Sequence, residues 1–208
     1  MRFKDRSEAG IRLAEKLEKY KNPDTVIYAL PRGGVVVGYR VALHLNAPLD
    51  ILVTRKIGHP QNPEYAVCAV AEDGHLLCNE EEKMYLDKEW LKRRIEEERE
   101  EARRRSDLYI KKSFRVSAKG KIAIIVDDGV ATGLTLRLAI EEVKHEKAKK
   151  IIAAVPVAPK GIAELIKREV DEFVAVDIPR IYMGAVGAYY DEFGQVRDEE
   201  VIRLLDRG

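Results

Sequence analysis

The chain has 208 residues, enough for one α/β domain with an appendage but too few for two full domains. Its 37 basic and 36 acidic side chains nearly cancel, and 46% of its residues are hydrophobic, which excludes a disordered chain and leaves no basic excess for a nucleic-acid partner. The N-terminus lacks the apolar stretch of a signal peptide, and no apolar run approaches the roughly 20 residues of a membrane helix, so we expect a cytoplasmic protein without a membrane partner.

The first third of the chain alternates helical and extended patterns. A parallel strand–helix–strand unit is expected here, because apolar runs of strand length flank an amphipathic segment. In chain order the elements are a helix capped by Asp5 or Ser7 and ending near Tyr20, a strand at Thr25–Leu30, a PRGG turn at 31–34, a helix to about Leu45 and a strand at Asp50–Thr54.

A loop and a hairpin then interrupt this alternation. Residues 55–64 (RKIGHPQNPE) hold two prolines and a glycine, which predicts a loop, and residues 65–79 are expected to form a hairpin turning at Asp73-Gly74. A two-residue turn would pair Cys78 with Ala69 and place Cys68 on the opposite face. We therefore expect two buried thiols rather than a disulfide, and no metal site, because no ligand cluster accompanies the cysteines.

A charged helical segment follows at residues 80–112. It carries eleven acidic and eleven basic side chains, and its apolar positions lie mainly in its first half, at Met84, Leu86, Trp90, Leu91 and Ile95. Balanced charge favours a solvated helix with internal ion pairs, or one that forms a homodimer, over a nucleic-acid-binding helix.

The second half resumes the alternation of strands and helices, which predicts a doubly wound sheet. The expected elements are strand Lys121–Val126, helix Thr132–His145, strand Lys150–Val157, helix Pro159–Arg168 and strand Glu172–Val176. A tail with an aromatic pair and a last helix at Asp198–Leu205 is expected to form a separate cap.

The turn after the strand Lys121–Val126 is the most informative for chemistry. Its free N–H groups, two glycines, two hydroxyls and the following helix N-terminus are the parts of a phosphate cradle. The preceding acidic pair would repel phosphate but accept hydrogen bonds from hydroxyl groups. A sugar monophosphate satisfies both halves, and the candidate binding residues are Asp127, Asp128, Gly129, Val130, Ala131, Thr132, Gly133, Leu134 and Thr135.

Three other interpretations fit this turn less well. The loop has no lysine and so does not match a Walker phosphate loop. Its acids are adjacent rather than alternate, as an Asp-x-Asp phosphatase would require. A plain capped helix N-terminus needs neither two consecutive acids nor a Thr-x-x-Thr pattern.

The segment VDDGVATGLT resembles the phosphoribosyl-diphosphate signature of type I phosphoribosyltransferases, and the chain is similar to a bacterial and archaeal branch with a PRGG turn and an Arg-Lys-x-Gly loop. The resemblance extends loosely over nearly the whole chain. It implies an α/β fold with a mostly parallel, doubly wound sheet flanked by helices. Residues 1–176 would form the core, with the helical insertion at about 80–112, and residues 177–208 a C-terminal hood.

The resemblance also assigns roles to two earlier segments. The PRGG turn corresponds to the pyrophosphate loop, which often contains a cis peptide bond, so Arg32, Gly33 and Gly34 are expected to contact a diphosphate. Arg55 and Lys56 begin the counterpart of the mobile catalytic loop and are expected to stabilise the charge of the leaving group. A plain tight turn and surface charges at a strand end are the respective alternatives.

The implied substrates are phosphoribosyl diphosphate and an acceptor that the hood selects. Mg²⁺ is expected to arrive with the diphosphate and to need no protein cage, so Asp127 or Asp128 would touch it at most through water. In the hood, Tyr182, Tyr189 and Tyr190 would either stack on a planar acceptor or form the core of the cap.

The expected activity, a step of nucleotide metabolism, is transfer of the 5-phosphoribosyl group to a nitrogen nucleophile, a nucleobase in most of the family, with release of pyrophosphate. A non-catalytic regulator that senses phosphoribosyl diphosphate or a nucleotide is the alternative. The balanced charge and the Arg55-Lys56 pair favour the enzyme. The sequence leaves the acceptor open.

Overall fold

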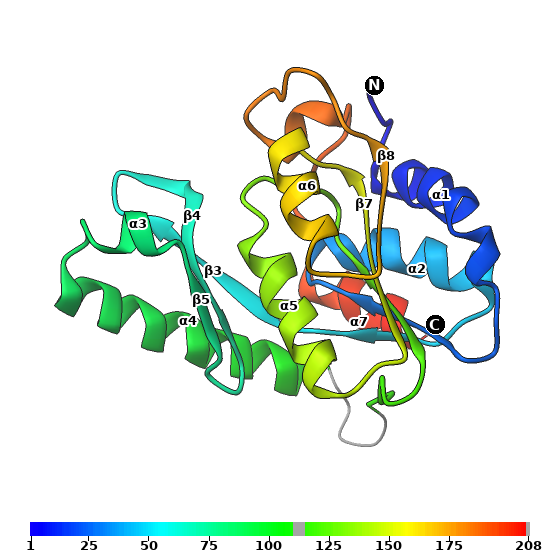
Figure 1. Cartoon of the computed structure of the whole chain (residues 1–208), viewed down its shortest axis with the longest axis horizontal. Helices are drawn as coiled ribbons and strands as arrows, with labels where there is room; N and C mark the ends of the chain where they lie inside the picture. Colours follow the sequence, from blue (N-terminus) through cyan, green and yellow to red (C-terminus); the bar gives the residue numbers. More distant parts are fainter. Residues whose placement is uncertain (110–114, 207–208) are drawn as a thin grey trace.

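A five-stranded parallel sheet forms the centre of the computed structural model, which describes residues 1–109 and 115–206 (Figure 1). Its order is β2-β1-β6-β7-β8. The middle strand is buried from Ala123 to Val126, as expected of a parallel strand covered on both faces. The strands are β1 (Thr25–Ala29), β2 (Leu49–Ile51), β6 (Ile122–Val126), β7 (Lys150–Val157) and β8 (Glu172–Asp177).

Helices cover both faces of this sheet, so the predicted doubly wound architecture is confirmed. One face packs on α1 (Arg6–Lys16), α2 (Gly33–Leu45) and α7 (Asp198–Leu205), and the other on α5 (Leu134–His145) and α6 (Lys160–Lys167). Asp5 caps α1 by accepting a hydrogen bond from the amide of Glu8 at 2.8 Å. Two short 3-10 turns, η1 (Glu18–Tyr20) and η2 (Val186–Tyr189), complete the core.

A second, antiparallel sheet stands beside the first, with the order β3-β4-β5. Its strands are β3 (Thr54–His59), β4 (Asn62–Ala71) and β5 (Leu76–Cys78). The predicted loop at residues 55–64 is therefore wrong, since Arg55–His59 is a strand and Asn62 already begins the next. The register shifts on either side of Gly58, where an added Cβ would lie 2.2 Å from the carbonyl oxygen of Pro63. The prolines thus occupy a turn and a bulge rather than ending the strands.

The expected pair of free thiols is also wrong, because Cys68 and Cys78 form a disulfide. The amide of Ala71 donates to the carbonyl of His75 at 2.9 Å, which leaves three residues in the turn instead of two. The added residue moves the register by one position, so Cys68 lies directly opposite Cys78. Gly74 has a φ of 98°, which is typical of the last residue in such three-residue turns.

The charged segment is two helices, α3 (Glu80–Lys83) and α4 (Lys88–Tyr109), rather than one. Asp87 starts α4 by accepting a hydrogen bond from the amide of Trp90 at 2.7 Å. The predicted helix residues 110–112 lie outside the described part of the chain. Leu91 and its apolar neighbours pack under the second sheet, whereas Ala102 and Tyr109 join the core of the first. Helix α4 therefore bridges the two sheets, and α5 packs on the opposite face of the second one through Leu134 and Leu138.

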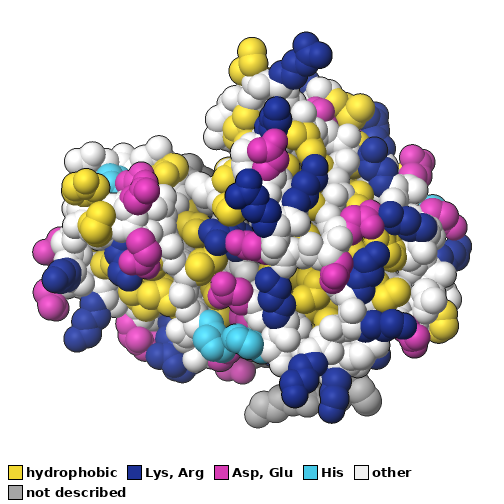
Figure 2. All heavy atoms as spheres, in the orientation of Figure 1, with side chains coloured by type: hydrophobic (Ala, Val, Ile, Leu, Met, Phe, Trp, Pro, Cys, Tyr) yellow, Lys and Arg dark blue, Asp and Glu magenta, His cyan; other side chains and the backbone are white. Residues whose placement is uncertain are grey.

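The C-terminal segment packs against the N-terminus of the chain. Phe3 forms a bridge with Tyr190, and both are buried with Tyr189 and Val157 at the end of β7. Basic and acidic side chains are interspersed over the face shown in Figure 2. Among the described residues, no helix is long and apolar enough to cross a membrane.

The disulfide can be tested by replacing both cysteines with serine. It joins residues ten apart, so loop-closure entropy predicts that Cys68→Ser/Cys78→Ser lowers the free energy of unfolding by about 2 to 3 kcal/mol. Urea unfolding with and without a reductant measures this loss. Reductant should destabilise the native sequence and leave the double variant unchanged. Two titratable thiols in the unreduced, unfolded protein would contradict the bond.

Candidate functional site

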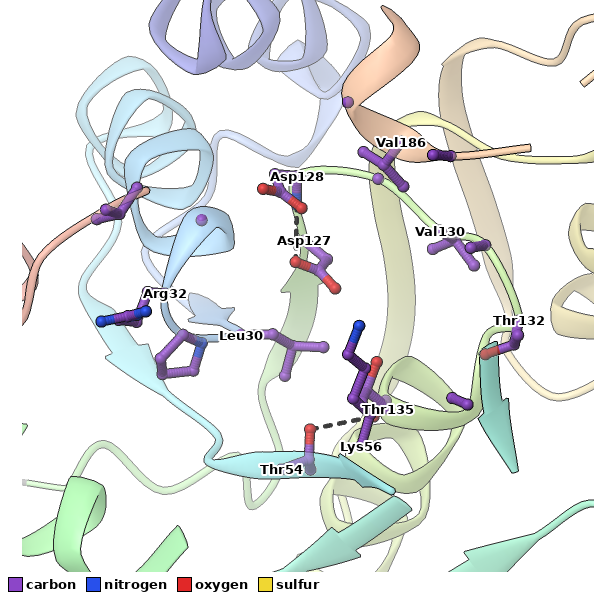
Figure 3. Close-up of a pocket in the computed structure, with 18 of the residues that line it drawn as sticks. Leu30, Arg32, Thr54, Lys56, Asp127, Asp128, Val130, Thr132, Thr135 and Val186 are labelled. Carbon is purple, nitrogen blue, oxygen red and sulfur yellow. Dashed lines mark hydrogen bonds between the residues drawn. The ribbon is translucent and has the colours of Figure 1, made fainter. Parts of the chain in front are cut away.

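A pocket of about 610 Å³ lies where the strands of the main sheet end and the second sheet approaches them (Figure 3). Ligands of open parallel sheets bind beyond these carboxyl ends. The lining residues come from α1, the turn after β1, β3, β4, α4, the acidic loop after β6 and the C-terminal segment 184–196. They are Arg6, Leu30, Pro31, Arg32, Gly33, Thr54, Arg55, Lys56, Ala66, Arg105, Asp127–Gly133, Thr135, Gly184–Gly187, Phe193, Gln195 and Val196.

The acidic pair stands at the centre of one wall. Asp127 points into the pocket, while Asp128 is turned toward the start of α2 (Figure 3). Asp128 accepts a hydrogen bond from Nε of Arg6 at 2.7 Å, and both side chains are largely buried, with 16% and 12% exposed. The same guanidinium donates to the carbonyl of Gly194 and lies 3.7 Å from the ring centroid of Phe193. Arg6 therefore ties the acidic loop to the hood.

Burial affects both carboxyl groups, and the ion pair with Arg6 distinguishes Asp128 from Asp127. Burial, together with the charge of Asp128, raises the pKa of Asp127 well above its ordinary value. Burial also raises the pKa of Asp128, but Arg6 opposes this effect. Asp128 is thus the better-stabilised anion, and Asp127 is the carboxyl group that gains most from hydroxyl donors in the pocket.

Backbone donors follow the acidic pair. Within the described residues, the amides of Ala131, Thr132 and Gly133 donate to no protein acceptor, whereas the amide of Val130 donates to the carbonyl of Val157 at 2.9 Å. Gly133 has a φ of 79° and immediately precedes α5, whose first amides are also unpaired by helix geometry. The positive end of α5 and these amides form a cradle for an anion.

The PRGG turn packs directly on the acidic pair. A Cβ on Gly33 would lie 1.9 Å from Oδ2 of Asp128, and one on Gly34 would lie 2.9 Å from Oδ1 of Asp127. The peptide bond between Pro31 and Arg32 is cis, as the resemblance implies. Arg32, expected to reach a diphosphate, points away from the acidic pair, and its guanidinium lies 3.5 Å from the carboxylate of Asp198 on α7 (Figure 3).

The two cations expected in the mobile loop have different surroundings. They are consecutive residues of β3, so their side chains leave opposite faces of the strand. Lys56 points into the pocket beside Thr135 (Figure 3). Arg55 lines the pocket as well, but its guanidinium is held by Glu98 on α4 at 2.7 Å.

The hood tyrosines form the core of the cap rather than the pocket wall. Tyr189 and Tyr190 are buried, and Tyr182 stacks on Tyr189 with ring centroids 5.4 Å apart. The hydroxyl of Tyr190 donates to the backbone carbonyl of Asp128, so this core also supports the acidic loop. The aromatic side chain at the pocket is Phe193, which is 37% exposed.

Twelve of the fourteen residues expected at the site line the pocket, and Gly34 and Leu134 do not. Gly34 lies behind the acidic pair, and Leu134 is buried against β4. Sequence reasoning missed Arg6, Thr54, Arg105 and Phe193, which no local motif marks. Among the described residues, no group of three or more His, Cys, Asp or Glu side chains is placed to hold a metal ion.

The contact between Gly33 and Asp128 generates a prediction. In Gly33→Ala the new methyl group must displace the carboxylate and disrupt its pair with Arg6, so we expect a loss of roughly 1–3 kcal/mol in the free energy of unfolding. Gly161→Ala on α6 is the matched control, because nothing lies within 4 Å of its added Cβ and helix propensity favours alanine. Equal stability of the two variants in urea would contradict the close contact between Gly33 and Asp128.

The raised pKa of Asp127 predicts a pH-dependent gain in stability on its replacement. The ionised carboxylate is unfavourable in the folded state, so stability is retained below the ordinary pKa of 3.8 and falls as the pH rises from there through the raised value. Asp127→Asn removes this fall. Thermal unfolding should therefore show a larger stabilisation by Asp127→Asn at about pH 8 than at about pH 4.5, whereas a pH-independent difference would argue against the shift.

Comparisons with known proteins agree with this geometry. The family model of the phosphoribosyl transferase domain matches residues 4–192. A crystal structure of a protein from Thermus thermophilus is 40% identical, with a TM-score of 0.79 over 99% of this chain and 98% of that one. An Aquifex aeolicus protein shares the fold, with 13% identity and a TM-score of 0.51 over 86% of this chain and 76% of that one.

A Mycobacterium tuberculosis protein provisionally named a phosphoribosyl transferase is 38% identical over 207 residues, or 99% of this chain. The chain spans 46% of the length of that relative. Both the match over residues 4–192 and the acidic loop at the end of β6 lead to the same assignment. The chain belongs to the phosphoribosyl transferase domain family and has the fold of the type I phosphoribosyltransferases.

Proposed function

We propose that the protein transfers the 5-phosphoribosyl group of phosphoribosyl diphosphate to a nitrogen nucleophile and releases pyrophosphate. The observation that carries the proposal is the juxtaposition, in one pocket, of the acidic pair, the amides of the following loop and the PRGG turn. Each part suits one group of the substrate: two ribose hydroxyls, a 5-phosphate and a diphosphate.

The 5-phosphate would lie on the cradle of Ala131–Thr135, where free amides and the N-terminus of α5 favour an anion. The 2- and 3-hydroxyls of the ribose would donate to Asp127 and Asp128. Burial raises the pKa of the second of these carboxyl groups, and the positive charge of Arg6 opposes that rise and so favours the anion, the stronger acceptor.

Transfer breaks the bond between C1 and the diphosphate oxygen and forms a bond from the nucleophile to C1, with inversion and loss of the proton of the nucleophile. C1 becomes positively charged in the transition state, and negative charge develops on the departing diphosphate. Lys56 points into the pocket from β3 and would stabilise that negative charge. Orientation in the pocket would supply much of the remaining rate, without a covalent intermediate.

The donor set of this pocket fits Mg²⁺ that arrives with the diphosphate. Asp127 offers a carboxylate in the pocket, and Mg²⁺ needs few protein ligands because it prefers phosphate oxygens and water. The ion would neutralise part of the diphosphate charge.

The acceptor would enter from the side of the hood. Gly184–Gly187 and Phe193 line this part of the pocket, and Phe193 is 37% exposed there and available for contact with a planar heterocycle. A nucleobase is the acceptor class that we propose.

Calorimetry with phosphoribosyl diphosphate and Mg²⁺ tests the proposal. The native chain should bind one equivalent, and it should release pyrophosphate when the correct base is supplied in a screen of nucleobases. Binding without release with any base would favour a sensor of phosphoribosyl diphosphate. Absence of binding would contradict both functions.

Lys56→Gln separates catalysis from binding within this experiment. The variant should still bind phosphoribosyl diphosphate, but its kcat should fall by about a hundredfold, because the lost charge acts mainly on the leaving group. Lys83→Gln on α3 is the control, since that lysine pairs with Glu80 outside the pocket. A fall in kcat of similar size in both variants would contradict the assigned role.

A further inference from the structure

Helix α4 is an insertion whose role the proposed reaction leaves unassigned, yet it reaches the pocket. Its first half packs under the second sheet through Leu91, and its second half is anchored in the main core through Ala102 and Tyr109 (Figure 1). These contacts hold the helix at both sheets. A side chain that α4 directs into the pocket is thereby placed as firmly as one from the sheet itself.

Arg105 is the side chain of α4 that lines the pocket. It is only 11% exposed, and its Nε donates to Glu101 one turn earlier at 2.7 Å. This is its only hydrogen bond among the described residues, so both terminal nitrogens of the guanidinium can donate to an incoming anion.

The charges around Arg105 place it at the same end of the pocket as the PRGG turn. Asp198 on α7 accepts a hydrogen bond from the hydroxyl of Tyr109 and lies 3.5 Å from Arg32. That hydrogen bond lowers the pKa of Asp198, and the charges of Arg32, Arg105 and Arg104 lower it further. Three arginines, Arg32, Arg104 and Arg105, therefore surround Asp198 beside the turn, and the terminal nitrogens of Arg105 make no hydrogen bond among the described residues.

A comparison with Arg104 separates anion binding by Arg105 from a role in stabilising the helix. Both arginines pair with Glu101, and together they lower the pKa of that carboxyl to about 2, with Arg104 contributing most. Arg104 is 54% exposed, as expected of a surface ion pair, whereas the side chain of Arg105 is 11% exposed and lines the pocket. Ion pairing along a helix surface does not require this placement, and a guanidinium that faces a pocket with unused donors can pair with an anion there.

We propose that Arg105 binds the diphosphate group of the sugar substrate, which makes helix α4 part of the substrate site. The inference rests on the proposed function and names a contact that the family motifs do not contain. A guanidinium can contact two phosphate oxygens at once, so Arg105 would act on the diphosphate from α4 together with the backbone of the PRGG turn.

Separate titrations with pyrophosphate and with ribose 5-phosphate, each with excess Mg²⁺, test this contact by calorimetry. Arg105→Gln should weaken pyrophosphate binding by about ten- to hundredfold, the effect of one lost charge-assisted hydrogen-bonding group, and leave ribose 5-phosphate affinity within about twofold. Arg104→Gln is the matched control and should leave both affinities within about twofold. Arg105→Lys should show an intermediate loss of affinity for pyrophosphate alone, because lysine keeps the positive charge but lacks the planar guanidinium that contacts two oxygens.

The possible failures have different meanings. Native pyrophosphate affinity in Arg105→Gln, or equal weakening of both ligands, would overturn the role of Arg105 and leave the proposed function standing. Binding of neither ligand by the native chain would overturn the proposed function itself. If Arg105→Gln does not fold, Arg105→Lys decides, and an unchanged pyrophosphate affinity in that variant would count against the bidentate contact.

Discussion

The close packing of the PRGG turn on the acidic loop is the constraint on which the site depends. Gly33 leaves no room for a Cβ beside Asp128, so the N-terminus of α2 and the end of β6 approach each other only with glycine there. Arg6 closes this contact by pairing with Asp128 and stacking on Phe193. One residue of α1 thereby contacts the PRGG turn, the acidic loop and Phe193 of the hood. These contacts fix the shape of the pocket wall.

The second sheet supplies the other side of the pocket. It lies between α4 and α5, with Leu91 packed on one face and Leu134 on the other. Its first strand directs Arg55 and Lys56 to opposite faces, so the arginine is held by Glu98 while the lysine points at the site beside Thr135. The strand, not a loop, therefore determines how the two cations are oriented relative to the pocket.

Much of the main sheet could be predicted from local patterns. The buried run Ala123–Val126 and the acidic, glycine-containing turn after it depend on neighbouring residues alone, so hydrophobic periodicity and turn chemistry locate them. The second sheet could not be predicted in the same way. Pro60 and Pro63 disfavour strands locally, and the pairing of β3 with β4 and the burial of Ile57 between β4 and α4 offset that tendency.

Contacts between distant segments account for the other features of the structure that local sequence patterns did not predict. The turn before His75 has one residue more than predicted, which changes the partner of Cys78 from Ala69 to Cys68. A shift of one position moves a side chain to the other face of the sheet, because side chains alternate between faces along a strand. Arg6 and Arg105 lie about 120 positions and about 20 positions before the acidic pair, and no spacing rule connects them with it. They reach the site through the packing of α1 and α4, which a motif does not encode.

The central claim is that the acidic loop and its cradle form a pentose-phosphate site. A crystal structure of the chain with ribose 5-phosphate tests it most directly. The account predicts the phosphate within hydrogen-bond distance of the amides of residues 131–135 and the 2- and 3-hydroxyls on Asp127 and Asp128. Phosphate bound at the PRGG turn instead, with the sugar directed away from the acidic pair, would contradict the account.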